Sequence, residues 1–442
     1  MPTDAVFTPP SGPIRGWIDG SVARATGIPY AMSDRFEEPR PVADRDGTLV
    51  ATDWSPACPQ RPVPFLDAVL GGSVEGLEAD EHCQRLSVTA PRDAGPGDGL
   101  PVMVWLHGGS YTSGAGDVPI MDPAPLVAEQ RVIAVTVTYR LGLFGYLGGV
   151  AGKPANLGLF DQLEALRWVR RNIAAFGGDP ERVTVFGQSA GGDAVAHLMA
   201  TPDASGLFRR AIIQSAPFAL ARRRAAMVEA MNEAARGITA DDSMQDVLDA
   251  QPAVEKAASG FGLRRATPFG TQYGQPPLPA EEDIDAAWHR HAPDVDVLIG
   301  HTAQEATLFV PRIPALQRLA RLPLIGRVLS RGAVAALTRI IYGAGSRRFA
   351  RRHARAGGSA HHYVVSWAAP GNPWRAAHTV DLPLLFGDEG TWQRADLVAG
   401  ARWADLDAAA KRVREVWGRF ARGEDLGDSG RVPGALSYHR VH

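Results

Sequence analysis

The pentapeptide at residues 187–191, Gly-Gln-Ser-Ala-Gly, constrains the fold of this chain more than any other segment. It follows the apolar run 183–186 and leads into residues 192–199, whose composition is typical of a helix. A G-x-S-x-G pattern between a strand and a helix predicts a sharp turn that exposes the serine hydroxyl above the edge of a sheet. The small residues of the pattern allow strand and helix to approach closely. We therefore interpret Ser189 as a candidate nucleophile, the alternative being a bystander serine in a glycine-rich turn.

The alternation of apolar runs with helical patterns predicts an α/β fold with a central, mostly parallel sheet flanked by helices. Segments 217–290 and 311–357 interrupt this alternation, and we expect them to form helical cap insertions above the sheet. Neither segment has an obvious core of its own, so residues 1–442 are expected to form a single domain. The expected strands are 102–106, 132–138, 182–186, 210–214, 295–299 and 362–365, and further expected helices are 159–176 and 408–422.

Charge and hydropathy exclude several classes of partner. The 46 basic and 48 acidic residues give a net charge of -2, which provides no general attraction to nucleic acid or to acidic membranes. No stretch approaches eighteen uninterrupted apolar residues, and the first ten residues lack the features of a secretory leader. We expect a cytoplasmic protein without nucleic-acid binding or stable membrane association. The eleven arginines of segment 311–357 are interpreted as the solvated face of cap helices, rather than as a surface for lipid or for anionic esters.

The chain has two cysteines, Cys58 and Cys83, and their spacing is not that of a metal site. They form either one disulfide, which would add about 3 kcal/mol of stability on the chain-entropy model, or two buried free thiols. A cytoplasmic compartment disfavours a persistent disulfide. The sequence leaves both alternatives open.

A second glycine-rich segment supplies what a serine nucleophile needs from the backbone. Acyl transfer requires a base, a carboxylate that orients the base, and backbone donors for the oxyanion of the tetrahedral intermediate. Residues 107–111, His-Gly-Gly-Ser-Tyr, directly follow the expected strand 102–106 and precede Ser189 by about eighty residues. We predict that this segment forms an oxyanion-hole loop, the alternative being a plain glycine turn after a strand.

Together these segments resemble the type B carboxylesterase family, which includes bacterial carboxylesterases and the cholinesterases. The similarity covers most of the chain and is densest between residues 100 and 215. This resemblance implies an α/β-hydrolase fold and a serine esterase that needs no metal or organic cofactor. Further motifs that carry it are residues 16–20, 27–31, 139–145, 156–162 and 176–180.

The resemblance also implies the remaining site residues. The family acid follows a strand that ends in glycine, and Glu305 matches that position, although Ala306 stands where the family commonly has glycine. The family histidine lies in a loop matched by residues 376–387, which selects His378 over the other eleven histidines. By position, the backbone N–H groups of Gly109, Ser110 and Ala190 would form the oxyanion hole.

Two residues depart from the family pattern. Gln188 stands where the family often has glutamate, and this weakens an interpretation as a hydrolase of cationic choline esters. Asp193 is unusual one residue after the double glycine, and we interpret it as a solvated carboxylate at the start of a helix, where the helix dipole favours it. Candidates for an aromatic lining of the substrate pocket, with ordinary core packing as the alternative, are Tyr111, Phe218, Phe309 and Trp367.

The sequence therefore predicts a serine carboxylic-ester hydrolase that acts on small to medium neutral esters through an acyl-enzyme on Ser189. Amide, carbamate or polyester substrates are the alternative, because they use the same triad chemistry. A non-catalytic binding role, which this fold also serves, is disfavoured because serine, acid and histidine are all present. The sequence does not determine the oligomeric state.

Overall fold

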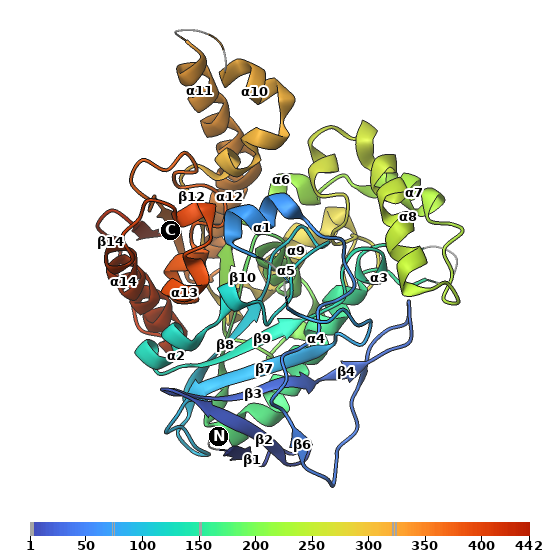
Figure 1. The fold of residues 1–442 in the computed structure, drawn as a ribbon, viewed down its shortest axis with the longest axis vertical. Helices are drawn as coiled ribbons and strands as arrows, with labels where there is room; N and C mark the ends of the chain where they lie inside the picture. Colours follow the sequence, from blue (N-terminus) through green and yellow to red (C-terminus); the bar gives the residue numbers. More distant parts are fainter. Residues whose placement is uncertain (1–3, 73, 75, 150–152, 321, 323–324) are drawn as a thin grey trace.

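The computed structural model describes residues 4–72, 74, 76–149, 153–320, 322 and 325–442, and within them one large sheet organises the chain (Figure 1). Among the described residues thirteen strands belong to this sheet, with β6 (Leu49–Val50) pairing beside β2. In spatial order the other twelve are β1 (Asp4–Phe7), β2 (Ile14–Asp19), β3 (Val22–Pro29), β7 (Arg85–Pro91), β9 (Ile133–Thr138), β8 (Leu100–Leu106), β10 (Gly178–Gln188), β11 (Arg210–Gln214), β12 (Asp296–Thr302), β13 (Ala360–Val365), β15 (Leu436–Arg440) and β14 (Ser429–Val432). Strands β4 (Ala31–Met32) and β5 (Arg40–Pro41) form a separate small pair.

The six strands expected from the sequence are the centre of this sheet, β8 to β13, and all of their pairings with one another are parallel. The expected α/β fold with a mostly parallel sheet is thus confirmed. Both margins are antiparallel, with β1, β2, β3 and β7 on one side and β15 and β14 on the other. These marginal strands were not expected, because polar residues, glycine or proline interrupt them and they lack the continuous apolar runs of the central parallel strands.

Side chains that alternate along the central strands pack into two separate cores, one on each face of the sheet. In β8, Val102, Val104 and Leu106 belong to one core, whereas Met103 and Trp105 belong to the other. This follows from the two-residue period of a strand, whose successive side chains point to opposite faces. All five side chains are fully buried, which explains why the sequence reads as an uninterrupted apolar run.

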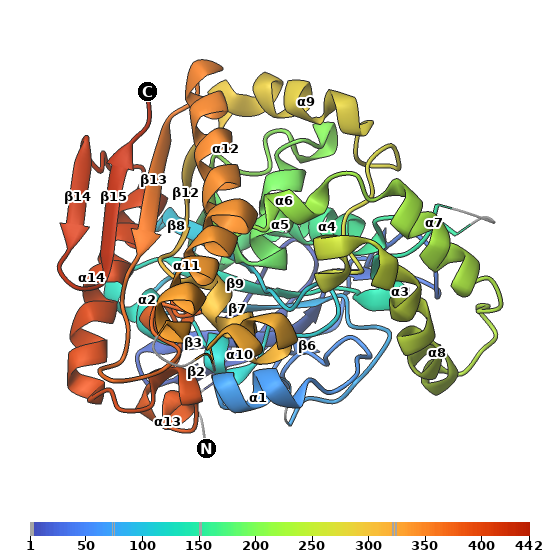
Figure 2. The same ribbon diagram turned by 90° about the horizontal axis from the view of Figure 1, so that it is seen from above.

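Helices cover both faces of the sheet. One face carries α2 (Ala124–Gln130) and α14 (Trp403–Arg422), and the other carries α4 (Leu157–Asn172), α5 (Ala190–Leu198) and α12 (Ala344–Arg355) (Figure 2). The expected helices at 159–176, 192–199 and 408–422 correspond to α4 with the 3₁₀ turn that follows it, to α5 and to α14. The remaining helices are α1 (Pro64–Leu70), α3 (Gly142–Gly145), α6 (Phe218–Ala221), α7 (Ala225–Ala234), α8 (Met244–Ala257), α9 (Ile284–His291), α10 (Pro314–Ala320), α11 (Gly326–Thr338) and α13 (Glu389–Trp392).

The two expected insertions are helical, as the sequence suggested. The first contains α6 to α9, and the second contains α10, α11 and α12. In Figure 1 the α7–α8 pair and the α10–α11 pair project from the body of the molecule on either side of α6. Arg321, one of the eleven arginines of the second insertion, and residues 323–324 lie outside the described residues. The division of the chain into one domain with two caps stays a prediction.

A buried ion pair joins two of the sequence motifs at the end of β9. Arg140 follows this strand and binds Asp161 of α4 through Nε at 2.9 Å and Nη2 at 2.8 Å, while its backbone N–H donates to the same carboxylate at 3.0 Å. The remaining guanidinium nitrogen donates to the carbonyl of Glu37 at 2.7 Å. Both ionic side chains are almost completely buried. The pair therefore fixes α4 against the edge of the sheet that carries the site.

The possible disulfide is not formed, because Cys58 and Cys83 are both free and buried in the structure. The backbone N–H of Leu141 donates to Sγ of Cys58 at 3.2 Å. Burial and contact with Cys58 raise the pKa of the Cys83 thiol well above its ordinary value. Since the thiolate is the reactive form, this environment keeps the thiol protonated and disfavours oxidation.

No helix in the described part of the chain is both long and apolar enough to cross a bilayer. The cytoplasmic location stays a prediction.

We expect Asp161→Asn to lower the free energy of unfolding by about 3–5 kcal/mol, since it leaves the buried Arg140 cation without its partner. The matched control is Asp93→Asn, which removes the partner of Arg131 in an exposed pair at 3.1 Å and should cost less than about 1 kcal/mol. Urea unfolding followed by fluorescence measures both variants. Equal losses in the two would contradict a structural role for the buried pair.

Candidate active site

Ser189 lies in a strained turn between β10 and α5. Its backbone has φ 58° and ψ −120°, a conformation that residues with side chains rarely adopt. Its N–H donates to the carbonyl of Gln214 on the adjacent strand β11 at 2.8 Å, and its carbonyl accepts from Asp193 N–H at 2.9 Å. Such strain costs on the order of 1–3 kcal/mol and persists only where the surroundings impose it.

Small residues are obligatory around this turn. A Cβ placed on Gly191 would lie 2.0 Å from the carbonyl oxygen of Leu106 at the end of β8, and one on Gly187 would lie 2.6 Å from the backbone of Gly191. A Cβ placed on Gly192 would likewise lie 2.6 Å from the carbonyl oxygen of Gln214. The structure therefore contains the close approach of strand and helix that the pentapeptide predicts.

Two residues that the sequence separates by 73 positions meet beside this turn. Nδ1 of His378 lies 2.5 Å from Oε2 of Glu305, and the backbone N–H of Thr302 donates to Oε1 of Glu305 at 2.7 Å. Glu305 is fully buried. Burial favours a raised pKa for Glu305, but the charge and hydrogen bond of His378 outweigh it, and the pKa is lowered. Glu305 is therefore an ionised carboxylate directed at the imidazole.

The other imidazole nitrogen faces Gln188 rather than Ser189. Nε2 of His378 lies 3.3 Å from the side-chain amide nitrogen of Gln188, and no hydrogen bond joins the Ser189 hydroxyl to an acceptor among the described residues. With Nδ1–H directed at Glu305, Nε2 is an acceptor that the Gln188 amide occupies. Hydrogen bonds of catalytic groups are often loose in unliganded proteins and tighten when substrate binds. Aromatic rings hold the imidazole in place, with Phe309 at 5.6 Å and Tyr342 at 5.2 Å.

The loop after β8 turns three consecutive residues into the left-handed region, Gly109 (φ 113°), Ser110 (φ 56°) and Tyr111 (φ 60°). The N–H groups of Gly109, Ser110 and Ala190 have no hydrogen-bond acceptor among the described residues. Ser110 and Ala190 line the same cavity as Ser189. Two residues with free N–H donors thus line the cavity of Ser189, and Gly109 directly precedes one of them.

The side chain of His107 packs beside this loop and is neutral. Its ring stacks on Tyr139 at 4.4 Å, its Nδ1 lies 2.8 Å from the carbonyl of Gly108, and Tyr139 donates its hydroxyl to the His107 carbonyl at 2.6 Å. Complete burial lowers the pKa of His107 to about 4. This histidine therefore shapes the loop and is uncharged in neutral solution.

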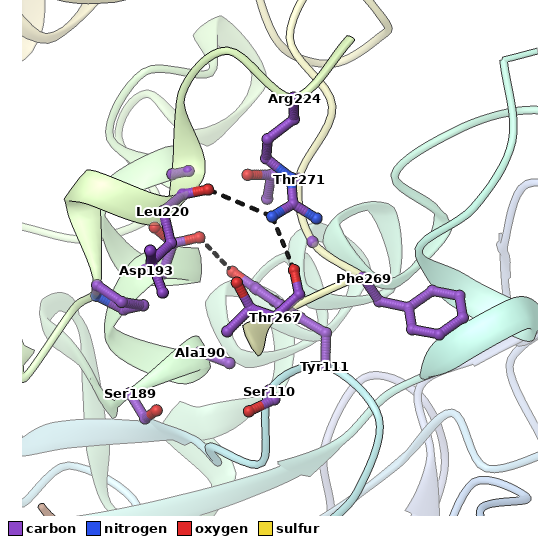
Figure 3. Close-up of a pocket in the computed structure, with 13 residues that line it drawn as sticks. Ser110, Tyr111, Ser189, Ala190, Asp193, Leu220, Arg224, Thr267, Phe269 and Thr271 are labelled. Carbon is purple, nitrogen blue, oxygen red and sulfur yellow. Dashed lines mark hydrogen bonds between the residues drawn. The ribbon is translucent and has the colours of Figure 1, made fainter. Parts of the chain in front are cut away.

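The cavity beside Ser189 has both apolar and polar lining residues (Figure 3). Its enclosed volume is about 20 Å³, which is room for about one water molecule. The apolar lining includes Leu220 and Phe269, and the polar lining includes Tyr111, Asp193 and Arg224. The remaining lining residues are Ser110, Ala190, Pro217, Ala221, Thr267, Gly270 and Thr271.

Comparison with known proteins agrees with this arrangement. The profile of the carboxylesterase family matches residues 3–321. The chain belongs to this family. It is 36% identical over 432 residues to the probable N-octanoylanthranilate hydrolase of Rhodococcus erythropolis, covering 95% of this chain and 93% of that protein. It is 38% identical over 321 residues to the para-nitrobenzyl esterase of Bacillus subtilis, covering 70% and 64% of the two proteins.

The solved structure of a thermophilic pNB esterase superimposes with a TM-score of 0.79 at 30% identity, covering 98% of this chain and 94% of that one. The protein is thus a serine hydrolase of the carboxylesterase family with the α/β-hydrolase fold, as the sequence motifs predicted.

The aromatic lining of the substrate pocket stays a prediction, and the structure places its four residues in different surroundings. Tyr111 lines the cavity, and Phe309 lies against the imidazole of His378 instead. Phe218 does not line it, because its ring stacks on Phe349 at 5.5 Å and meets Trp288 edge-on at 6.3 Å. Trp367 is buried in the core on the opposite side of the site, away from this cavity. Sequence spacing could not separate these positions, since all four residues follow strands or begin insertions.

The interpretation of Asp193 as a solvated carboxylate is wrong. Asp193 lies in the first turn of α5, as expected, but it is 3% exposed. Tyr111 donates its hydroxyl to Oδ2 of Asp193 at 2.7 Å, and Nδ1 of His197 lies 3.3 Å from the same oxygen. Burial favours a raised pKa for Asp193, but His197 and Tyr111 outweigh it and the pKa is lowered. An ionised carboxylate from the first turn of α5 therefore lines the cavity beside Ser189.

A second buried carboxylate near the triad residues, Asp381, was not singled out from the sequence. Gln214 donates its amide to Oδ2 of Asp381 at 2.6 Å and accepts in turn from Trp417 Nε1 at 3.3 Å, whereas Oδ1 has no partner among the described residues. Burial raises the pKa of Asp381 to about 6. The one sequence signal for Asp381 is its position three residues after His378, in the loop that matches the family.

We expect Gly109→Ala to lower kcat/KM by about 100-fold or more, a typical loss when one oxyanion donor is misplaced. A Cβ at this position would lie 1.9 Å from the carbonyl oxygen of Ser113 and would displace the loop. Gly97→Ala is the matched control, because Gly97 has a similar φ of 98° and open space around it. Steady-state kinetics on a p-nitrophenyl ester and a thermal melt are the measurements. Equal kcat/KM in both variants would contradict a role for this loop.

We expect Asp381→Asn to stabilise the protein more at pH 8 than at pH 5. The folded-state pKa of about 6 lies above the ordinary value of 3.8, so the ionised form is disfavoured by folding. The cost that folding pays to keep this carboxylate ionised is therefore fully present above pH 6, and it disappears when the pH falls below the unfolded-state pKa of 3.8. Linkage then makes the gain from the substitution roughly 1 kcal/mol larger at pH 8. Urea unfolding at the two pH values measures it, and a gain that falls as pH rises would contradict the argument.

Proposed function

We propose that this carboxylesterase hydrolyses small to medium neutral esters through an acyl-enzyme on Ser189, with His378 as the base and Glu305 as its orienting acid. The observation that carries the proposal is the buried Glu305–His378 pair beside the strained Ser189 turn. A nucleophile, a base in the right tautomer and free oxyanion donors are the three elements that acyl transfer needs.

In the first half-reaction the Ser189 hydroxyl attacks the ester carbonyl carbon and its proton passes to Nε2 of His378. For this step the imidazole must release the Gln188 amide and accept from Ser189 instead. Glu305 stabilises the resulting imidazolium. The carbonyl oxygen becomes an oxyanion that accepts from the N–H groups of Gly109, Ser110 and Ala190. Collapse of this intermediate expels the alcohol, which takes the proton from Nε2.

In the second half-reaction a water molecule attacks the acyl-enzyme. His378 accepts one proton from the water, the oxyanion forms in the same hole, and the bond to Oγ of Ser189 breaks. The proton on Nε2 passes to Oγ, and the carboxylic acid product leaves and releases its proton to the solvent. The free serine and the neutral imidazole are restored, so the cycle consumes one water and one ester.

A second candidate reaction is the hydrolysis of an N-acylated aromatic amine. It is supported by the similarity to the N-octanoylanthranilate hydrolase, which extends over nearly the whole length of both proteins. Amide and ester hydrolysis share the same steps, and the leaving amine takes the proton from His378 just as an alcohol does. The two candidates differ only in the leaving group that the protein accepts.

We expect Ser189→Ala to lower the hydrolysis of p-nitrophenyl acetate, butyrate and octanoate by at least about 1,000-fold, to the level left by binding and oxyanion contacts alone. Release of p-nitrophenolate measures the three esters, and liquid chromatography measures N-octanoylanthranilate in parallel.

The control is Ser205→Ala, a serine in an exposed turn after α5. This variant should retain the wild-type rates. Equal turnover by wild type and Ser189→Ala would contradict the proposal, and no turnover by the wild type of any ester or of the amide would favour a binding role. Turnover of the amide alone would favour the second candidate.

A further inference from the structure

Helix α11 of the second insertion exposes large apolar side chains to solvent. Ten such side chains are exposed among the described residues, and five of them lie between residues 322 and 340. Val328 of α11 is 69% exposed, and Ile325 at the start of the helix is 57% exposed. A surface helix of a soluble protein normally buries its apolar stripe and exposes polar residues. Helix α11 therefore departs from the usual arrangement of a cap helix.

The exposed apolar residues of α11 follow one helical stripe. Successive turns of the helix place positions that are three or four residues apart on the same face. A Cβ placed on Gly332, in the middle of the stripe, would meet nothing within 4 Å, so this face is open. The residues of the stripe are Ile325, Val328, Leu329, Gly332, Ala335, Ala336 and Ile340. This stripe, named here the outer face of α11, contains no carboxylate, amide or hydroxyl side chain.

The hairpin of α10 and α11 leaves this outer face without a partner in the described part of the chain. The two helices make their main contacts with each other and with the adjoining turns at residues 305–312 and 339–343. In Figure 1 the hairpin projects from the body of the molecule. Leu316 of α10 and Val334 of α11 are buried, so the hairpin has apolar residues of its own on the inside. The apolar residues of the outer face are therefore additional to those that the hairpin needs for its own packing.

The sequence around the outer face is exclusively cationic. Residues 306–357 contain eleven arginines and no lysine, aspartate or glutamate. The net charge of -2 for the whole chain therefore conceals a strongly basic segment. Arg331 and Arg339 are exposed beside the outer face, and Arg318 is exposed on α10. None of these three arginines has a carboxylate partner among the described residues. The outer face thus combines apolar side chains with unneutralised positive charge.

An anionic lipid surface accommodates both properties of this face. When a helix lies in the plane of a membrane surface, its apolar side chains enter the acyl region and its arginines extend to the lipid phosphates. A second copy of this chain would bring the same arginines face to face, and such like-charge contacts disfavour association. Nucleic acid would pair with the arginines but would leave the apolar side chains in water. Charge and apolar exposure together therefore favour lipid.

We propose that the outer face of α11 docks the protein reversibly on anionic phospholipid membranes. Ile325, Val328 and Leu329 enter the acyl region, and Arg331 and Arg339 bind the lipid phosphates. One helical face gives peripheral attachment, which agrees with the lack of a membrane-spanning helix in the described part of the chain. This inference replaces the expectation that the arginines of the second insertion form only a solvated face, because that expectation did not include the apolar side chains exposed beside them. It concerns binding alone and is independent of the proposed ester hydrolysis.

Co-sedimentation of the whole chain with sucrose-loaded vesicles tests the proposal. Vesicles of phosphatidylcholine alone are compared with vesicles in which about one third of the lipid is phosphatidylglycerol. We expect the partition coefficient to be about tenfold or more higher for the anionic vesicles, because the arginines are attracted to the negative surface. Raising NaCl from about 0.05 M to about 0.5 M should remove most of this difference, since salt screens the attraction.

A double variant of the outer face locates the apolar contribution. Val328→Ser with Leu329→Ser should lower the partition coefficient on anionic vesicles by about tenfold or more, because two inserted apolar side chains are lost. The matched control is Val6→Ser with Leu263→Ser, since these side chains are 66% and 52% exposed on β1 and on the first insertion. The control should bind vesicles like the wild type.

A second double variant locates the charge contribution. Arg331→Gln with Arg339→Gln should reduce the preference for anionic vesicles by about tenfold and leave binding to neutral vesicles unchanged. Arg290→Gln with Arg412→Gln is the matched control, because it removes two exposed arginines elsewhere and changes the net charge equally. All four variants replace exposed side chains, so they should fold normally, and a thermal melt checks this.

Three results would overturn the inference. Equal binding of the wild type to neutral and anionic vesicles would contradict the role of the arginines. Binding that survives the Val328→Ser and Leu329→Ser substitutions would place the docking surface elsewhere. Failure to bind either kind of vesicle would exclude lipid as the occupant, and a dimer that the same double variant dissociates in analytical ultracentrifugation would then identify a second copy of the chain. Each result is read from binding, so none depends on whether the protein cleaves esters.

Discussion

The contact between strand β8, the turn at Ser189 and helix α5 is the constraint on which the rest of the structure depends. Gly191 lies so close to the Leu106 carbonyl that no side chain fits, and this contact forces Ser189 into its strained conformation. The parallel pairing of β8, β10 and β11 brings the oxyanion loop and the serine to the same edge of the sheet. The same register continues through β12, which places Glu305 just beyond that edge.

The imidazole of His378 is held by contacts that the strands alone do not provide. Glu305 fixes one nitrogen, Phe309 and Tyr342 pack on the ring, and Gln188 occupies the other nitrogen in the unliganded state. Phe309 precedes the second insertion and Tyr342 belongs to it, and the two residues flank the α10–α11 hairpin in the sequence. The second insertion therefore contributes to the site, because its residue Tyr342 packs on the imidazole of His378.

Most of the fold and the core of the candidate site follow from local sequence. The six central strands, the glycine turns and the order of Ser189, Glu305 and His378 were all predicted, because each depends on a few neighbouring residues and on motifs that match a family. Asp193 was assigned to solvent, whereas the structure buries it. Its partner Tyr111 lies 82 positions earlier in the chain, in the loop after another strand, and no local pattern indicates that contact.

The sequence by itself determined the α/β alternation, the nucleophile turn and the family, since strand period, turn chemistry and motif order are readable within short windows. Only the tertiary structure decided what the cavity beside Ser189 contains. Residue 193 comes from the helix after the nucleophile, residue 224 from the first insertion and residue 111 from the oxyanion loop, and their side chains meet only after the chain has folded. The physical reason is that burial and pairing of polar groups are properties of three-dimensional surroundings, which no local pattern encodes.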